Sequence, residues 1–285
     1  MDKTANIGAG LYLVATPIGN LADITLRALD VLKASALVAC EDTRVSGVLL
    51  AHYGISKPLV SVREHNERRA AEKIVAAVRG GAAVAYVSDA GTPAISDPGA
   101  RLAATVQAAG LAVVPVPGAS AAAAALSACG QALEHWLFYG FLPAVAGERR
   151  RVLDSLHALP YALVFYEAPH RILQTVDDLA QTLGAGRTLS VARELTKRFE
   201  TIHTLPLEEA PAWLRADANR QRGEFVLIVS GVVNPPDEAR ASLRKTLAVL
   251  LDYLPVSQAA QAAARLTGQK KNAAYDLALE MKAKT

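Results

Sequence analysis

Short apolar segments alternate along the first 120 or so residues with longer segments in which apolar side chains recur every three or four positions. The continuous apolar runs are typical of strands buried on both faces of a parallel sheet, and the longer segments are typical of amphipathic helices. The alternation predicts an α/β domain with helices on both faces of its sheet. The expected strands are residues 11–15, 37–40, 59–62, 84–87 and 111–116.

Each expected strand ends in a cluster of small, polar or charged residues. The clusters are TPIGN (16–20), EDTR (41–44), REHN (63–66), SDAGTP (88–93) and PGASA (117–121). The carboxyl ends of parallel strands lie at one edge of a sheet, where open α/β folds bind ligands. The five clusters are therefore expected at one edge. After the first of them, a helix capped near Asp23 is expected.

The segment after residue 87 carries the most distinctive turn chemistry. Asp89, Gly91 and Thr92 cannot continue a strand, but they suit a tight turn whose backbone N–H groups point outward. Asp97 is placed to cap the next helix and Pro98 suits its first position. This order of strand, loop and helix predicts a small-molecule site, and a tight turn without a ligand is the alternative.

A second α/β unit follows a boundary at residues 130–136. Its expected strands are residues 137–142, 162–166, 189–192 and 225–229, and residues 170–183 are expected to form a helix. Two of its strands end in the clusters EAPHR (167–171) and RELTK (193–197). The predicted domains are residues 1–132 and 133–233, with a cleft where the polar ends of the two sheets face each other.

A smaller extension is expected at the C-terminal end. Residues 232–237 have the composition of a linker, and helices are expected to start near residues 254–257 and 267–271. The predicted extension, residues 238–285, fits either a helix-turn-helix or a plain helical hairpin. Eight basic and five acidic residues occur from 237 onward, so this part carries the whole formal charge of +3. A basic tail suggests a polyanionic partner, although a solvated helix face is the commoner outcome.

Composition narrows the class of protein. The chain has 285 residues, of which 52% are hydrophobic and 20% charged, as expected for a soluble globular protein of two ordinary domains. The uncharged and mostly apolar window at residues 111–133 contains Pro115, Pro117 and Gly118 and is better explained by a strand, a turn and a buried helix than by a membrane span. The first ten residues of the sequence contain no apolar signal segment, so a cytoplasmic protein is expected.

Three common kinds of functional site find no support in the sequence. The two cysteines, Cys40 and Cys129, are far apart, and the six histidines show no metal-ligand spacing, so neither disulfides nor a metal site is expected. The Gly8-Ala9-Gly10 segment precedes its strand instead of following it, which argues against a dinucleotide fingerprint. No phosphate-binding GxxxxGK[ST] motif occurs.

Taken together and in order, the clusters resemble those of the tetrapyrrole-methylase superfamily of S-adenosylmethionine-dependent methyltransferases. The likeness is greatest to the bacterial branch that methylates a cytidine 2′-hydroxyl of 16S ribosomal RNA. The resemblance implies two α/β domains, a methyl donor bound between them and a homodimer acting on 16S ribosomal RNA or the small ribosomal subunit. The motifs that carry it are LYLVATPIGNLADIT (11–25), ACEDTR (39–44), REHN (63–66), VSDAGTPAISDPG (87–99), PVPGASAAAAALSACG (115–130), FYGFLP (138–143), FYEAPHR (165–171), ARELTKRFE (192–200) and GEFVLIVSG (223–231).

The resemblance also implies which residues contact the donor. They lie after the first strand, in the loop after residue 87, at the next helix start and at two strand ends of the second unit. These residues are Pro17, Ile18, Asp89, Gly91, Thr92, Ser120, Ala121, Tyr166 and Ala192.

Methyl transfer from a sulfonium is an in-line displacement, so the protein mainly aligns the reactants and excludes water. A ribose hydroxyl also needs a group that accepts its proton. Glu167 and His65 are the preferred candidates, followed by Glu41, Asp42 and Glu194, all at expected strand ends. The alternative for each carboxylate is an ion pair that only shapes its loop, and for His65 a structural hydrogen bond.

RNA recognition relies on backbone charge and on splayed bases. The candidate RNA-binding residues are Arg44, Asn66, Arg171, Arg193, Lys197, Lys270 and Lys271. A solvated or salt-bridged side chain is the alternative for each cation. Few aromatic residues accompany them, so a stacking platform is not evident in the sequence.

Two other functions remain open at this point. One is a tetrapyrrole methylase, or a protein methylase of the diphthine type, with the same donor site. The other is a nucleic-acid-binding module without catalysis. The acids and bases at the strand ends favour an enzyme, because binding alone does not need them.

Overall fold

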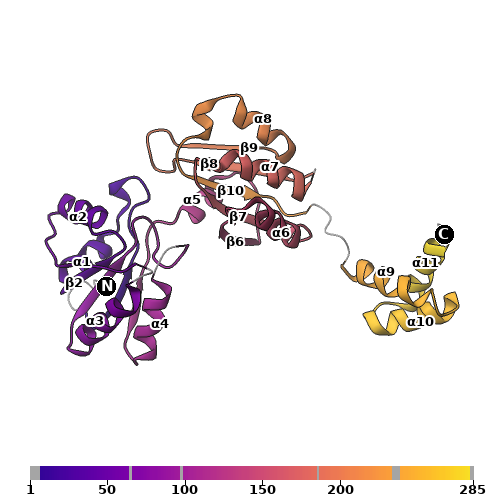
Figure 1. Cartoon of the computed structure of the whole chain (residues 1–285), viewed down its shortest axis with the longest axis horizontal. Helices are drawn as coiled ribbons and strands as arrows, with labels where there is room; N and C mark the ends of the chain where they lie inside the picture. The colour runs from indigo at the N-terminus through magenta and orange to yellow at the C-terminus, as the bar shows by residue number, and fades with distance from the viewer. Residues whose placement is uncertain (1–6, 64–65, 97–98, 185, 233–237, 283–285) are drawn as a thin grey trace. The chain divides into compact units, whose positions relative to one another are not determined.

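The computed structural model describes residues 7–63, 66–96, 99–184, 186–232 and 238–282. The chain divides into two compact units, and Figure 1 labels their helices and strands. One unit comprises residues 1–154 and 162–230 and contains both β-sheets, and the other comprises residues 155–161 and 231–285. Each unit is described by itself below.

The first sheet has five strands in the order β3-β2-β4-β1-β5, and every pairing is parallel. This confirms the predicted parallel sheet and places all five strand exits at one edge. Its central strand, β4, is buried along its whole length because helices cover both faces. The strands are β1 (Gly10–Val14), β2 (Leu37–Cys40), β3 (Leu59–Ser61), β4 (Ala83–Val87) and β5 (Val113–Val116).

Alternate residues of the strands enter different cores. Tyr12 and Ala85 pack with α1 and α2, whereas Leu11 and Val84 pack with α3 and α4 on the opposite face. This alternation is the two-residue period of a strand, and it confirms that helices lie on both faces. The helices are α1 (Leu26–Ala34), α2 (Thr43–His52), α3 (Glu67–Arg79) and α4 (Ala100–Ala108).

Two helix starts differ from the sequence-based expectation. No α-helix begins at Asp23, because residues Leu21–Asp23 form the 3-10 turn η1, which the Asn20 side chain caps. The helix α1 begins at Leu26, where the Thr25 hydroxyl accepts a hydrogen bond from the Ala28 N–H. The expected caps Asp97 and Pro98 lie outside the described residues, and α4 begins at Ala100 after Gly99, whose φ is 120°.

The second sheet has five strands in the order β6-β7-β10-β8-β9. Only β6 and β7 run parallel, while β10 pairs antiparallel with both β7 and β8, and β8 pairs antiparallel with β9. The edge strand β9 was not predicted. The strands are β6 (Trp136–Phe141), β7 (Ala162–Glu167), β8 (Thr188–Arg193), β9 (Thr201–Pro206) and β10 (Phe225–Val229).

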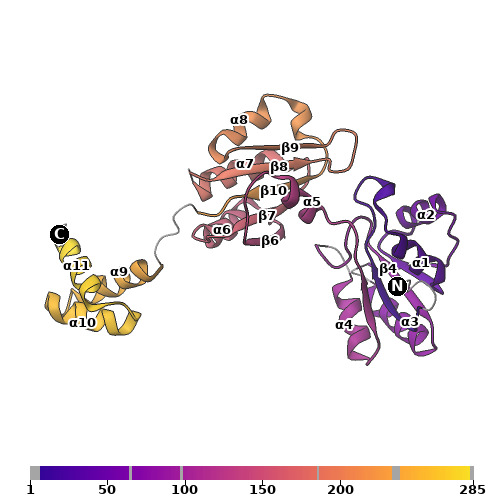
Figure 2. The same ribbon diagram turned by 180° about the vertical axis from the view of Figure 1, so that it is seen from behind.

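The helix α5 (Ala121–Ala128) follows the first sheet in the chain but packs on the second. Its buried residues Ala122 and Ala125 share a core with Val164 of β7 and Val226 of β10, and Figures 1 and 2 both show α5 beside this sheet. Because alanine side chains are short, the helix lies close to the strands. The expected boundary at residue 132 therefore assigns α5 to the wrong sheet.

The remaining helices of the unit that holds both sheets connect or cover strands of the second sheet. A buried ion pair of 2.6 Å joins Arg149 Nη2 of α6 to Asp178 Oδ2 of α7. The helices are α6 (Ala146–Leu156), α7 (Ile172–Leu183) and α8 (Ala210–Arg215), together with the 3-10 turns η2 (Leu207–Glu209) and η3 (Ala218–Gln221). Thus α7 begins two residues after the expected start at His170.

The C-terminal unit contains α9 (Glu238–Leu250), α10 (Val256–Thr267) and α11 (Lys271–Lys282). They surround a small core of leucines and alanines that includes Leu247, Ala260 and Leu277. The helices at 256 and 271 begin where the sequence predicted them. The expected linker at residues 232–237 lies outside the described residues except for Val232.

Candidate functional site

Two loops at the carboxyl edge of the first sheet are joined by paired backbone hydrogen bonds. The Thr16 N–H donates to the Gly91 carbonyl oxygen at 2.9 Å, and the Gly91 N–H donates to the Thr16 carbonyl oxygen at 3.0 Å. Gly91 has a φ of 77°, which a residue with a Cβ atom adopts only at a cost. A Cβ atom there would also lie 3.4 Å from Ile18 Cγ2.

A third loop, which follows β5, joins the first two. The Thr92 hydroxyl donates to the Ala119 carbonyl oxygen at 3.0 Å, immediately before the start of α5. Ser120 caps this helix, and its hydroxyl accepts a hydrogen bond from the Ala123 N–H. The exits of β1, β4 and β5 therefore form one connected wall.

The second sheet contributes an aromatic wall. The Tyr166 hydroxyl accepts a hydrogen bond of 3.2 Å from the Ala122 N–H in the first turn of α5. Its ring packs edge-on against Phe138 and Phe141 of the edge strand β6, with centroid separations of 4.9 and 5.6 Å. These contacts fix the ring beside the loops of the first sheet.

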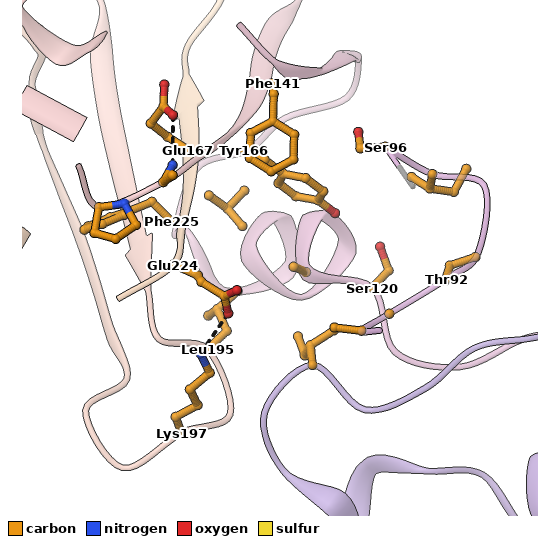
Figure 3. A pocket seen from close by; sticks show the side chains of 18 residues that line it. Thr92, Ser96, Ser120, Phe141, Tyr166, Glu167, Leu195, Lys197, Glu224 and Phe225 are labelled. Atoms are coloured by element: carbon orange, nitrogen blue, oxygen red, sulfur yellow. Dashed lines mark hydrogen bonds and ion pairs between the residues drawn. The ribbon is translucent and has the colours of Figure 1, made fainter. Parts of the chain in front are cut away.

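A pocket of about 280 Å³ lies where these walls meet (Figure 3). Its lining combines loop residues that follow β1, β4 and β5 with residues of the second sheet and its loops. The lining residues are Ile18, Ala90, Gly91, Thr92, Ile95, Ser96, Ser120, Ala121, Phe141, Tyr166, Glu167, Ala168, Pro169, Leu195, Lys197, Glu224, Phe225 and Val226.

A charged cluster borders the pocket on the side of the second sheet. Lys197 Nζ lies 2.9 Å from Glu194 Oε1 and 2.8 Å from Glu224 Oε2. Burial acts to raise the pKa of Glu194, but hydrogen bonds from Lys197 and the Glu224 N–H outweigh it and hold the pKa below its usual value. Burial acts to lower the pKa of Lys197, and the two carboxylates raise it overall. Glu194 and Lys197 are therefore both charged near neutral pH.

Four residues other than glycine near the pocket have a positive φ. Ala94 and Ser96 lie in the loop after β4, and Glu194 and Thr196 lie in the loop after β8. Such conformations are sparsely populated and cluster at functional sites, where surrounding contacts hold them in place. Both loops contribute residues to the pocket.

Six of the nine residues predicted to contact the donor line this pocket: Ile18, Gly91, Thr92, Ser120, Ala121 and Tyr166. The other three do not. Pro17 is buried, Ala192 is buried beneath α5, and Asp89 is exposed beside the pocket, where its carboxylate accepts a hydrogen bond from the Asp42 N–H at 3.1 Å.

The structure gives Glu167 a local structural role. Its buried carboxylate accepts hydrogen bonds from the Ala168 N–H at 2.8 Å and the Thr175 hydroxyl at 2.5 Å, and it lies 3.3 Å from Arg171 Nε. In Figure 3 the Glu167 carboxylate points away from the Tyr166 ring. Both oxygens are already used in holding the start of α7. The other preferred base, His65, lies outside the described residues.

The acidic residues after β2 differ in their surroundings. Asp42 caps α2 and pairs with Arg44 and Arg63, and these contacts, led by the Arg44 hydrogen bond, hold its pKa well below the usual value. Among the described residues, no hydrogen bond or ion pair reaches the Glu41 carboxylate. Burial, followed by the nearby Asp89 carboxylate, raises the pKa of Glu41.

Most predicted RNA-binding cations of this unit already have intramolecular partners. Arg171 donates to the Leu142 carbonyl oxygen at 2.6 Å, and Arg193 donates to the carbonyl oxygens of Asn219 and Arg222. Arg44 pairs with Asp42 but remains 86% exposed. The Asn66 side chain bridges the Arg63 N–H and the Ser61 carbonyl oxygen.

In the C-terminal unit, Lys270 and Lys271 are both exposed at the turn between α10 and α11. The side-chain ammonium groups of both lysines form no hydrogen bond or ion pair with another residue of the part of the chain described. Their exposure leaves them available to a polyanion.

The sequence-based prediction missed Glu224, Phe225 and Val226 as pocket residues. Glu224 directly precedes β10, and Phe225 and Val226 begin it. All three belong to the quoted motif GEFVLIVSG, but no local pattern shows which end of a strand in a mixed sheet faces a ligand. Phe141 was missed as well, although it belongs to a quoted motif. The bulge next to Gly140 turns it toward the pocket.

Within the described ranges, no helix is long and apolar enough to cross a membrane. A search of the same residues finds no group of three or more His, Cys, Asp and Glu side chains that could hold a metal ion.

The fold, with its parallel sheet and its mixed sheet, is similar to that of solved methyltransferases. A Thermus thermophilus uroporphyrin-III C-methyltransferase, solved with S-adenosylhomocysteine, has a TM-score of 0.55 and 20% identity over 78% of this chain and 97% of that one. The cobalt precorrin-4 methyltransferase CbiF has a TM-score of 0.58 and 16% identity over 77% of this chain and 94% of that one. At such identities the likeness establishes the fold.

The family assignment comes from sequence comparison. Residues 10–211 match the model of the tetrapyrrole (corrin/porphyrin) methylases, and residues 237–282 match the RsmI C-terminal HTH domain. The chain belongs to the tetrapyrrole methylase family, and it is therefore a methyltransferase by descent.

Close relatives match over nearly the whole chain. Ribosomal RNA small subunit methyltransferase I of Escherichia coli O157:H7 is 49% identical over 270 residues, which are 95% of this chain and 94% of that protein. The protein of the same name from Pseudomonas aeruginosa is 48% identical over 96% of this chain and 98% of its own length.

Proposed function

We propose that this protein transfers a methyl group from S-adenosylmethionine to the ribose 2′-hydroxyl of a cytidine in 16S ribosomal RNA. The observation that carries the proposal is the identity of 48–49% to ribosomal RNA small subunit methyltransferase I over nearly the full length, C-terminal helices included. That these helices match too favours the RNA reaction over a tetrapyrrole reaction, because the tetrapyrrole enzymes compared cover only 77–78% of the chain.

The pocket fits the proposed donor. Ile18, Leu195 and Val226 offer apolar contact to a purine, and the Ser120 hydroxyl lies at the same surface. Glu224 supplies a carboxylate near a cationic ligand, although it shares Lys197 with Glu194. When bound, the donor supplies an activated methyl group, and the enclosing walls exclude water from it.

Among the predicted carboxylate bases that the structure describes, Glu41 is the one we now favour. Glu167, Asp42 and Glu194 each hold hydrogen bonds or ion pairs that keep them in structural use. Glu41 follows β2, the neighbour of β4 in the sheet, and its raised pKa makes it a stronger base than an ordinary carboxylate. In this role Glu41 accepts the hydroxyl proton as the ribose oxygen attacks.

Contacts to RNA are assigned to both units. In the first unit, the Arg44 side chain is more exposed than those of Arg171 and Lys197, although all three form ion pairs. Lys197 lines the pocket itself. In the C-terminal unit, Lys270 and Lys271 are free to bind phosphate. We also propose a cytoplasmic homodimer that acts on the small ribosomal subunit.

Within each chain, we propose that the first α/β domain ends before α5 and that the second ends near residue 233.

One assay tests the proposal against its alternatives. The purified protein is incubated with labelled S-adenosylmethionine and, in parallel, with small ribosomal subunits, naked 16S ribosomal RNA and a tetrapyrrole mixture. Label in a cytidine ribose is the expected result. Label only in the ring compound rejects the RNA reaction, and no label in any acceptor favours a binding protein without catalysis.

A further inference from the structure

The loop between β8 and β9, residues 194–200, is tightly closed by its own hydrogen bonds. The Lys197 N–H donates to the Glu194 carbonyl oxygen at 3.0 Å, and the Glu200 N–H donates to the Lys197 carbonyl oxygen at 3.1 Å. The Glu200 carboxylate accepts from the Thr196 N–H at 2.6 Å. We call this segment the 194–200 loop. Its backbone has one defined shape although it lies at the surface.

The 194–200 loop is part of the pocket and touches the first sheet's loops. Leu195 and Lys197 line the pocket. A Cβ atom added to Gly19, in the loop after β1, would fall 2.6 Å from Lys197 Cγ. Arg198 and Phe199, which follow Lys197 in the chain, therefore lie next to the pocket.

Phe199 is fixed through its backbone, while most of its side chain is exposed. Its carbonyl oxygen accepts hydrogen bonds from Arg193 Nη2 and the Thr201 hydroxyl, both at 3.3 Å. The residue is nevertheless 64% exposed. Burial of a phenylalanine ring stabilises a fold, and this ring gives up much of that stabilisation. An exposed aromatic ring on a loop of defined conformation indicates that a ligand covers the ring when it binds.

A cation lies directly beside the exposed ring. The guanidinium carbon of Arg198 lies 5.6 Å from the Phe199 ring centroid, within the range of a cation–π contact, and Arg198 is itself exposed. Arg222, whose carbonyl oxygen accepts a bond from Arg193, adds another exposed cation to the same region. An aromatic face beside guanidinium groups is the combination that binds unstacked nucleobases and their phosphates.

We propose that Phe199, with Arg198 beside it, stacks on a nucleobase of single-stranded RNA next to the nucleotide held at the pocket. The proposal rests on the proposed RNA reaction and names a substrate contact for it. A second copy of this chain is the other candidate to cover the ring. Symmetric pairing would bring the Arg198 groups of two loops together, and such like-charge contact disfavours it.

The test compares three substitutions of the ring. Phe199→Ala and Phe199→Leu both remove the aromatic face, but Leu keeps apolar bulk, and Phe199→Tyr retains the ring. Each is assayed for the KM of RNA methylation, for binding of a labelled single-stranded RNA of about ten nucleotides by anisotropy, and for donor affinity by calorimetry. Trp136→Ala is the matched control, since Trp136 is 50% exposed at the opposite end of β6 from the pocket residue Phe141.

Loss of one stacked base is expected to weaken RNA binding about tenfold in Phe199→Ala and Phe199→Leu, with a matching rise in KM. Phe199→Tyr and Trp136→Ala stay near wild type, and donor affinity is unchanged in all four. Unchanged RNA affinity in both Phe199→Ala and Phe199→Leu overturns the proposal. So does a shift in oligomeric state, by sedimentation, that occurs without any loss of RNA binding.

A fluorescence measurement separates this proposal from the proposed function. In Phe199→Trp, stacking of a base on the new indole is expected to quench emission on addition of the same RNA, relative to the wild type with its native tryptophans. If the wild-type protein transfers no methyl group to RNA but the quenching occurs, the reaction is wrong and the stacking contact stands. If RNA is methylated without quenching, the stacking contact is wrong.

Discussion

The charged residues of this protein fall into two groups: those whose side chains form ion pairs or hydrogen bonds that stabilise the fold, and those whose side chains are available for binding or catalysis. Neighbouring residues of α7 illustrate the contrast. Asp178 pairs with Arg149, which is 1% exposed, while Asp177 pairs with Arg215 at the surface. The Glu41 carboxylate has no hydrogen bond or ion pair among the described residues. The burial of each charge, more than its presence at a strand end, decides what it does.

Replacing Asp178 tests the buried ion pair. Asp178→Ala is expected to lower the free energy of unfolding by about 3–5 kcal/mol, because it leaves the Arg149 guanidinium buried without its counter-charge. Asp177→Ala, one position earlier, is expected to cost about 1 kcal/mol or less, because its pair is exposed. Urea denaturation followed by circular dichroism measures both. Similar losses for the two variants would contradict this view of the pair.

Replacing Glu41 tests the proposed base. Glu41→Gln is expected to lower kcat for RNA methylation about 100-fold or more, because the hydroxyl proton loses its acceptor. In the wild type the rate should fall as pH drops through the raised pKa of Glu41, above the ordinary value of 4.5. That acid limb should be absent from the residual activity of the variant. A wild-type pH profile in Glu41→Gln would remove Glu41 from the reaction.

The same variant has a stability consequence of defined sign. A carboxyl whose pKa is raised by folding binds its proton more tightly in the folded state, so its charged form destabilises the fold near neutral pH. Glu41→Gln should therefore unfold at a higher temperature than the wild type at pH 7. The gain should vanish well below pH 4.5, where the carboxyl is protonated in both states. Calorimetric scans at the two pH values measure it.

At the scale of elements, the strands were more predictable than the loops and caps. The strands Leu37–Cys40 and Phe225–Val229 have the predicted bounds, because each is a continuous apolar run between polar clusters. The edge strand Thr201–Pro206 escaped prediction because one side of it has no strand neighbour and its side chains are only partly buried. The first helix start was misplaced because the Thr25 cap, and not Asp23, bonds a helical N–H.

The pocket was predictable only in part, because some of its residues are placed by local turns and others by the pairing of distant strands. The loops after β1, β4 and β5 carry recognisable turn residues, and they did converge. The contributions of β10 and β6 depend on strand direction and on the bulge next to Gly140, which reflect pairing between distant segments. Ala192 was expected at the pocket as a strand-end residue, yet the packing of α5 covers it.

The paired loops after β1 and β4 give a prediction for one glycine. Gly91→Ala is expected to weaken donor binding about tenfold, because a residue with a Cβ atom is strained at a φ of 77° and relief of this strain shifts the paired loops. Gly54→Ala is the control, since its φ is 64° and nothing lies within 4 Å of the added Cβ. It should cost stability but leave donor affinity in calorimetry unchanged. Equal affinities for the Gly91 variant and the wild type would contradict the proposed donor site.

At the scale of the whole molecule, the charge is unevenly distributed. The formal excess of +3 resides in the segment from residue 237 onward, most of which forms the C-terminal unit. The unit with the pocket is close to neutral and uses most of its strand-end cations internally. We therefore expect the long-range attraction of a polyanion to come mainly from the C-terminal unit, and the contacts next to the reacting nucleotide to come from the unit with the pocket.

Charge reversal tests that division. Lys270→Glu with Lys271→Glu is expected to weaken RNA binding and to reduce the slope of log affinity against log salt by about 1.5, because two phosphate contacts are lost. Lys33→Glu with Lys73→Glu makes the same change in net charge at exposed positions on α1 and α3. Binding titrations over a range of salt compare the two. An identical slope in both would leave the C-terminal lysines without a phosphate contact.

The position of α5 has a consequence for dividing the gene. If the polypeptide is divided after Gly130, the alanine-rich helix α5 stays on the N-terminal piece. Its buried face then no longer packs on β7 and β10, and this exposed apolar face favours aggregation. Breaking the chain just ahead of Ser120 instead lets the C-terminal piece keep the helix on its own sheet. Complementation between separately expressed halves should therefore succeed at the earlier break and fail at the later one.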